Sequence, residues 1–220
     1  MHPERGLVPP LEFIPQAEDI GLIIPIGEFV LRAACLQTKA WRDAGFPDLW
    51  VSVNLSARQF QDQKLVSKIS QILAETGLPG AGLRLEVTES VAMQDVGYGI
   101  KVLKELNKLG VHVSLDDFGN GYSSLSYLKQ FPLKVLKIDR SFIQDILVNK
   151  NSEAITTAII VMARSLGLEV VAEGVEKEEQ LDFLKSKFCD EVQGFLFSKP
   201  LPVKELTGLL QKNFLIDPKR

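Results

Sequence analysis

Apolar and polar residues alternate along this chain with two different periods, and each period predicts one kind of element. Runs in which every second residue is apolar predict strands, whereas apolar residues that recur every three or four positions predict helices. Six runs predict strands, at residues 49–55, 83–88, 111–116, 135–139, 168–173 and 191–196. The helical stretches that alternate with them centre on residues 64–76, 99–109, 123–130, 153–166, 177–187 and 203–211.

Ahead of the first strand, residues 14–44 carry apolar side chains at helical spacing. Pro25 interrupts this pattern and Gly45 closes it, so two consecutive helices are expected there. Strands that alternate with helices imply parallel pairing, because right-handed crossovers are the usual connection between parallel neighbours.

The predicted strands are polar at every second position, which a fully covered parallel sheet would not be. In residues 83–88, the apolar residues Leu83, Leu85 and Val87 alternate with Arg84, Glu86 and Thr88. A parallel sheet covered by helices on both faces reads as continuous apolar runs. In a barrel, the inner face points into a lumen that turns polar where a site is built. The pattern therefore predicts an α/β fold, a TIM-like (β/α)8 barrel with six of its eight strands in this chain.

Each predicted strand carries one polar residue of inward parity near its C-terminal end. These residues are Asn54, Glu86, Asp116, Lys137, Glu173 and Gln193. A single one would read as a cap of the following helix. Six of them on six strands predict a site, because barrel active sites lie at the carboxyl ends of the strands.

The expected site is rich in oxygen ligands and contains no cysteine. Carboxylate and amide oxygens suit Mg²⁺ or Mn²⁺ better than zinc. Adjacent Asp116 and Asp117 could bridge two ions, or they could cap the turn at residues 118–121. Lys137 lies in an otherwise apolar strand and needs a partner, for which Asp139 is the expected candidate. This pair could be a structural ion pair, or the lysine could orient the attacking water or the phosphate.

Composition restricts the class of protein further. The 220 residues carry a formal net charge of −3 with scattered Lys and Arg, so binding of duplex nucleic acid is not expected. Two cysteines without disulfide or zinc spacing fit a reducing compartment. No apolar run approaches the roughly 20 residues that span a bilayer. A cytoplasmic location is expected, and the sequence leaves open that these residues belong to a larger membrane-tethered signalling protein.

Nine short motifs resemble those of the EAL domain family, in order and over essentially the whole chain. They are HPERGL at 2–7, EFIP at 12–15, VNLS at 53–56, EVTE at 86–89, DDFG at 116–119, GYSSL at 121–125, LKID at 136–139, AEGVE at 172–176, and QGF at 193–195 with KP at 199–200. The resemblance implies a phosphodiesterase that hydrolyses cyclic di-GMP to linear 5'-pGpG at a site with two Mg²⁺ or Mn²⁺ ions.

The resemblance also implies roles for individual residues. The metal ligands would be Asn54, Glu86, Asp116, Asp117 and Glu173. Lys137 would contact the catalytic water and act with Glu173 and Glu176 in catalysis. Gln193 and Asp139 would contact substrate. Glu89 would steady the loop at residues 117–124, which the family uses in metal binding and dimer coupling and which carries an unusual Asn120 here.

The chain departs from the family pattern at its start. In the family, two strands precede the helix that begins near Phe13, and the second carries the Glu-Ala-Leu signature with a metal ligand. Neither strand is in this sequence. Residues 1–220 are therefore expected to form a single EAL-type domain, N-terminally incomplete, with little or no phosphodiesterase activity and with self-association through exposed strand edges.

Two other functions remain open on the sequence alone. Some family members lose ligands and act as catalytically inactive cyclic-di-GMP receptors or interaction modules. A barrel lyase of the enolase type would share the architecture but should lack the loop at residues 116–119. The enzyme is favoured, since every later motif residue is intact.

Overall fold

The computed structural model describes residues 4–6, 8–119 and 125–212. Six strands form one parallel sheet in the order β1-β2-β3-β4-β5-β6, so each strand pairs with the next one along the chain. Their bounds are β1 (Val51–Asn54), β2 (Leu83–Thr88), β3 (His112–Phe118), β4 (Val135–Ile138), β5 (Glu169–Glu173) and β6 (Glu191–Gln193). All six predicted strands are confirmed, and β6 is shorter than the sequence pattern suggested.

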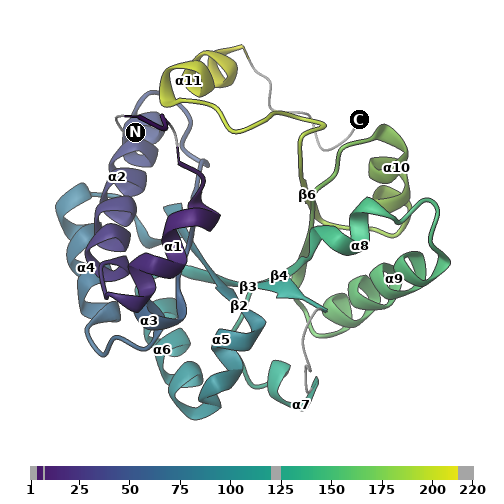
Figure 1. Cartoon of the computed structure of the whole chain (residues 1–220), viewed down its shortest axis with the longest axis horizontal. Coiled ribbons are helices and arrows are strands. Elements are labelled where there is room, and N and C mark those ends of the chain that lie inside the picture. The colour runs from purple at the N-terminus through teal and green to yellow at the C-terminus, as the bar shows by residue number, and fades with distance from the viewer. Residues whose placement is uncertain (1–3, 7, 120–124, 213–220) are drawn as a thin grey trace.

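Long helices cover the outside of this sheet. They are α2 (Ile23–Asp43), α4 (Leu65–Thr76), α6 (Val96–Lys108), α9 (Lys150–Ser165), α10 (Glu178–Ser186) and α11 (Val203–Gln211). Figure 1 shows the helices outside the curved strands and α11 above the opening between α2 and β6. The expected parallel α/β barrel architecture is confirmed as an open arc of six strands, whose two end strands are β1 and β6.

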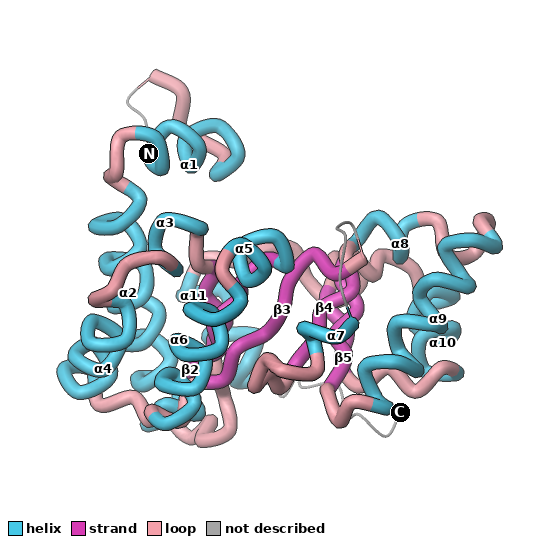
Figure 2. Tube along the Cα trace, turned by 90° about the horizontal axis from the view of Figure 1, so that it is seen from below, coloured by secondary structure: helices cyan, strands magenta, loops and turns pink. Residues whose placement is uncertain are grey.

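Shorter helices lie at one end of the arc. They are α3 (Ala57–Phe60), α5 (Glu89–Gln94) and α8 (Arg140–Gln144), which follow β1, β2 and β4 directly. Elsewhere, the four-residue helix α7 (Leu125–Leu128) comes after β3, and a 3-10 turn, Gly80–Gly82, precedes β2. Helix α1 (Pro10–Asp19) lies at the same end as α3, α5 and α8 (Figure 2). The carboxyl ends of the strands therefore open toward this end.

Residue parity along the strands separates the core from the lumen. Leu83, Leu85 and Val87 are at most 1% exposed and belong to the main apolar cluster that packs beneath the helices. The residues between them, Arg84 and Glu86, are buried polar groups on the opposite face. The same division separates Leu136 and Ile138 from Lys137 in β4. The polar alternation thus marks the barrel interior, as expected.

The break between the first two helices lies earlier than Pro25. Gly21 takes the left-handed conformation with φ 79°, a conformation that glycine adopts without steric cost. Pro25 lies within the first turn of α2, where backbone N–H groups have no partner inside the helix, so proline is tolerated. The expectation that Pro25 interrupts the helical stretch was therefore wrong, although the two helices are present.

A polar contact crosses the interior of the arc near its amino-terminal end. Arg84 of β2 donates from Nη1 to Glu191 Oε2 of β6 at 3.0 Å, and its guanidinium lies 3.6 Å from the ring centroid of Trp50. Since β2 and β6 are not neighbours in the sheet, this pair links strands that backbone hydrogen bonds do not join. A second long-range contact, from Trp41 Nε1 to Thr207 Oγ1 at 2.8 Å, ties α2 to α11.

In the part of the chain that the structure describes, no helix combines the length and the apolar character needed to cross a bilayer.

Candidate metal centre

Three carboxylates meet at the carboxyl ends of adjacent strands. Glu86 of β2, Asp116 of β3 and Glu173 of β5 each offer an oxygen, and these oxygens lie within 4.8 Å of one another. Lys137 of β4 lies among them, with Nζ 2.6 Å from Glu86 Oε2, 3.3 Å from Asp116 Oδ1 and 2.5 Å from Glu173 Oε1. Four of the six inward residues expected from the sequence are thus in contact.

Strand register explains the convergence. Asn54 pairs with Glu86, whereas Asp116 pairs with Thr88, two residues beyond Glu86. The ligand positions are therefore offset between neighbouring strands, as expected for the staggered strands of a barrel. Lys137 pairs with Val171, two residues before Glu173 on the same face of β5. Side chains from four neighbouring strands therefore point into the same part of the lumen.

The charges at this point do not balance. Glu86, Asp116 and Lys137 are all less than 10% exposed, and three carboxylates face one ammonium. Burial alone would lower the pKa of Lys137, but the negative charges of Glu86, Asp116 and Glu173 outweigh it and raise that pKa. Burial raises the pKa of Asp116 and of Glu173, and the lysine offsets only part of that rise. The excess negative charge favours an added cation.

The donor set fits a hard divalent cation. All three clustered donors are carboxylate oxygens. Asn54 of β1, which pairs with Glu86 of β2, adds an amide oxygen. Mg²⁺ and Mn²⁺ prefer such oxygen ligands, whereas zinc prefers nitrogen and sulfur. Both cysteines of the chain lie elsewhere, Cys35 within α2 and Cys189 just before β6.

Asp117 occupies an irregular point in β3. Its φ of 55° is unusual for a non-glycine residue, and the pairing of β3 with β4 shifts register between Leu115 and Phe118. The irregularity leaves the Asp117 side chain exposed and close to that of Asp139. Partial burial, followed by the charges of Asp116 and Asp139, raises the pKa of Asp117.

Lys137 was expected to form its main contact with Asp139, and this expectation was wrong. The ion pairs of Lys137 are with the three clustered carboxylates. Asp139 instead ends β4 as the N-cap of α8 and accepts a hydrogen bond from Ser141 N at 2.9 Å.

The remaining expected residues lie around the cluster. Asn54, Gln193 and Glu176 are exposed, and Gln193 pairs with Glu173 in the register of β5 and β6. Glu89 is 4% exposed and accepts a hydrogen bond from Gly119 N at 3.5 Å, just before the loop. Residues 120–124, including Asn120 and most of the GYSSL motif, fall outside the described residues.

Sequence reasoning missed one buried polar residue beside the site. Gln180 is 2% exposed and hydrogen-bonds to the loop that carries Glu176. The available signal was its position at the third residue of α10, where a glutamine side chain commonly bonds back to the backbone before the helix.

The sequence model of the EAL domain matches residues 1–200. The signaling protein YkoW of Bacillus subtilis is 50% identical over 92% of this chain, and the bifunctional diguanylate cyclase/cyclic di-GMP phosphodiesterase MucR of Pseudomonas aeruginosa is 46% identical over 93%. The chain spans 25% and 30% of the lengths of these two relatives.

A solved structure agrees with both the fold and the sequence match. The PaMucR phosphodiesterase in complex with c-di-GMP superposes with a TM-score of 0.91 at 46% identity, covering 93% of this chain and 83% of that one. A family match over most of the chain, together with this superposition, leads to one conclusion. The chain belongs to the EAL domain family.

Proposed function

We propose that this domain hydrolyses cyclic di-GMP to linear 5'-pGpG in a reaction that requires Mg²⁺ or Mn²⁺. The observation that carries the proposal is the buried cluster of Glu86, Asp116 and Glu173 around Lys137 at the open end of the strands. The name of the similar MucR protein and the c-di-GMP complex of the similar PaMucR structure support the choice of substrate.

The clustered carboxylates would hold the metal in this proposal. Glu86, Asp116 and Glu173 would be ligands, with Asn54 and Asp117 completing a two-metal site. Such ions, when bound, activate a water and neutralise charge on a phosphoryl group. The added positive charge would also relieve the repulsion among the three carboxylates.

Lys137 would act as a cation and a hydrogen-bond donor. Its raised pKa keeps it protonated at neutral pH, so it is unsuited to serve as a base. An ammonium in this position can orient the attacking water or the phosphate while the carboxylates keep it fixed.

Three residues around the cluster would act on or contact the substrate. Glu176 would take part in catalysis from the loop after β5, and Gln193 and Asp139 would contact the dinucleotide. Glu89 would steady the loop after β3 through its bond to Gly119 N.

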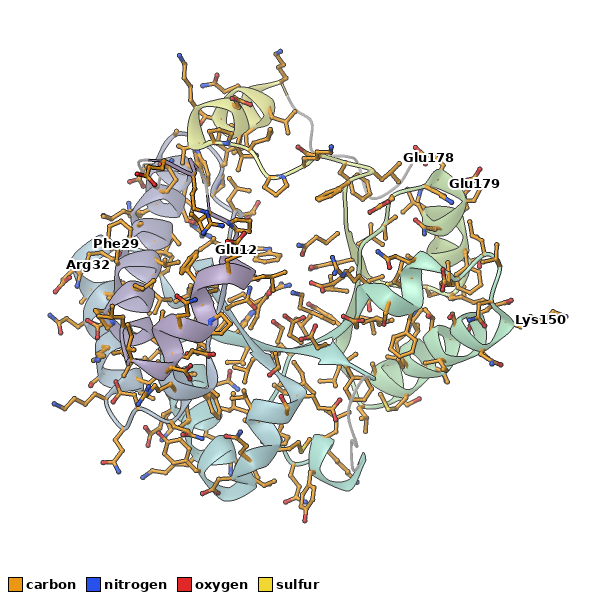
Figure 3. The ribbon with its side chains drawn as sticks, in the orientation of Figure 1. Glu12, Phe29, Arg32, Lys150, Glu178 and Glu179 are labelled. Carbon is orange, nitrogen blue, oxygen red and sulfur yellow. The ribbon has the colours of Figure 1, made fainter. Side chains whose placement is uncertain are left out.

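Metal-dependent turnover tests the proposal directly. Cyclic di-GMP would be incubated with the protein and Mg²⁺, Mn²⁺ or a chelator, and the linear product quantified chromatographically. Asp116→Asn should lower turnover by at least about 100-fold, because loss of a ligand weakens transition-state stabilisation by several kcal/mol. Glu179→Gln is the control, since Glu179 lies on the outer side of α10 (Figure 3).

The outcomes separate the enzyme from the receptor. Turnover that survives the chelator, or that is unchanged in Asp116→Asn, would contradict the proposed site. Tight binding of cyclic di-GMP without any product would instead identify a catalytically inactive receptor.

The proposal also includes self-association of the chain and a cytoplasmic location. The end strands β1 and β6 of the open arc offer edges on which another copy could dimerise or assemble further, and sedimentation at several concentrations tests this. Persistence of a monomer at the highest concentration would contradict it. A cytoplasmic location is supported by Cys35 and Cys189, which are both free thiols.

A further inference from the structure

The loop between β5 and α10, residues 174–177, is held from inside by one side chain. Gln180 Oε1 accepts hydrogen bonds from Glu176 N at 2.8 Å and from Lys177 N at 2.9 Å. Its Nε2 donates to Ile143 O at 2.9 Å. With the residue only 2% exposed, both ends of the amide are satisfied by backbone groups of two different segments.

The Ile143 carbonyl belongs to α8, which follows β4 and therefore Lys137. Gly174 shows how closely the loop approaches this helix: its φ is 73°, and a Cβ there would lie 2.7 Å from Arg140 Cβ. Gln180 thus bridges two segments that extend from the neighbouring strands β4 and β5.

The segment after β6 fixes the loop on its other side. Val175 N donates to Gln193 O at 3.1 Å, and Leu196 N donates to Val175 O at 3.0 Å. Gly194 permits this contact, because a Cβ there would lie 2.0 Å from Val175 O. The backbone of residues 174–177 is therefore held between α8 and the segment that follows β6.

Glu173 and Glu176 depend on this loop to different degrees. Glu173 belongs to β5 and is held by pairing with Gln193 in β6. Glu176 lies outside the strand with an exposed side chain, and the hydrogen bond from its N–H to Gln180 Oε1 holds its backbone beyond the contacts of Val175.

We propose that Gln180 is a positioning residue that fixes the backbone of Glu176 and thereby places the Glu176 carboxylate for catalysis. This inference rests on the proposed phosphodiesterase function. Preorganisation of a side chain by a buried hydrogen-bonding neighbour commonly contributes about 10- to 100-fold to activity. Metal binding depends on the strand residues and is not expected to change.

A double-mutant cycle tests the coupling. Gln180→Leu removes all three hydrogen bonds and should lower kcat by about 10- to 100-fold, with KM and Mn²⁺ affinity changing by less than about threefold. In a Glu176→Gln background, Gln180→Leu should cause little further loss, because it acts through Glu176. Gln180→Glu keeps the shape and an acceptor for both amides, but its buried carboxylate faces the Ile143 carbonyl, so it should restore only part of the lost kcat.

Asn107→Leu is the matched control. Asn107 also donates from its side-chain amide to a backbone carbonyl, Pro132 O at 2.7 Å, in a part-buried contact. It lies in the last turn of α6, which precedes β3, and not in the loop after β5. Its effect on kcat should be small and equal in both backgrounds.

Hydrogen exchange provides a readout that does not require activity. The Glu176 and Lys177 amides should exchange at least about tenfold faster in Gln180→Leu, and not in Asn107→Leu, because only the first variant removes their acceptor. If the wild-type domain gives no turnover, the proposed function fails while exchange still reports on the loop. Two results would overturn the positioning role: both amides stay protected in Gln180→Leu, or the kcat losses of Gln180→Leu and Glu176→Gln are independent of each other. Gln180 would then be only a cap of α10.

Discussion

Lys137 is the residue on which the charge balance of the lumen depends. It is 4% exposed and contacts all three clustered carboxylates. Lys137→Ala should lower kcat by about 100-fold or more and leave KM for cyclic di-GMP nearly unchanged, because a lysine that orients the attacking water stabilises the transition state and not the bound substrate. Steady-state kinetics with Mn²⁺ measures this, and a loss confined to KM would make Lys137 a binding residue instead.

The raised pKa values of the cluster predict how stability depends on pH without metal. A carboxyl with a raised pKa in the folded state stabilises the fold below its ordinary pKa, and that contribution is lost as pH rises through the raised value. The pKa values of Asp116 and Glu173 are both raised. The metal-free protein should therefore lose stability as pH rises from the ordinary carboxyl range, about 4, toward neutrality.

Glu173→Gln tests this pH dependence. With a chelator present, the variant should melt at a higher temperature than the wild type near pH 7, because it no longer carries a half-buried carboxylate charge that Lys137 offsets only in part. The difference should vanish near pH 4, where Glu173 is protonated in both states. Thermal melts across this range with Glu179→Gln as an exposed control measure it; a difference that is constant with pH would contradict the assignment.

The sequence located the inward residues correctly but not the partner of Lys137. Period-two alternation was sufficient to place Glu86, Asp116 and Lys137 on one face. Residues two apart on a strand are separated by about 6.6 Å, whereas neighbouring strands lie about 4.8 Å apart. The carboxylates of other strands are therefore closer than Asp139, and only the register reveals them.

At the scale of elements, the long helices and the short α7, within the stretch at residues 123–130, were predicted, whereas three other short helices were missed. Helices α3, α5 and α8 have four to six residues, too few to show a 3.6-residue period. Their signals are local: Ser56 accepts a bond from Gln59 N, and Asp139 accepts one from Ser141 N. Such caps are also common in ordinary turns, so the pattern alone does not separate the two.

Two glycines in different elements should respond in opposite ways to the same substitution. Gly194→Ala places a Cβ against the Val175 backbone and should destabilise the fold by about 1–3 kcal/mol, as overpacking does. Gly208→Ala lies within α11 with no atom near the new Cβ and should stabilise it by about 0.5–1 kcal/mol. Denaturant unfolding of both variants measures this, and equal effects would contradict the close contact at Gly194.

At the scale of the whole molecule, the topology was predictable because strand order follows chain order. Alternating strands and helices with right-handed crossovers leave few other arrangements. The contact between Arg84 and Glu191 was not predictable, since its two residues are 107 positions apart and no local pattern links them. Only the curvature of the sheet brings β2 and β6 together.

The ion pair between Arg84 and Glu191, a bridge between β2 and β6, also affects the folding pathway. Each strand can pair with its predecessor as soon as one helix has formed, whereas the bridge requires most of the arc to be complete. Arg84→Met should therefore leave the folding rate unchanged and raise the unfolding rate about tenfold, equivalent to about 1.4 kcal/mol for loss of the partly exposed ion pair and of the contact with the Trp50 ring. Stopped-flow folding and unfolding in denaturant measures both limbs. A slower folding limb would place the bridge in the nucleus; the expected result makes it a late contact that governs how long the native state persists.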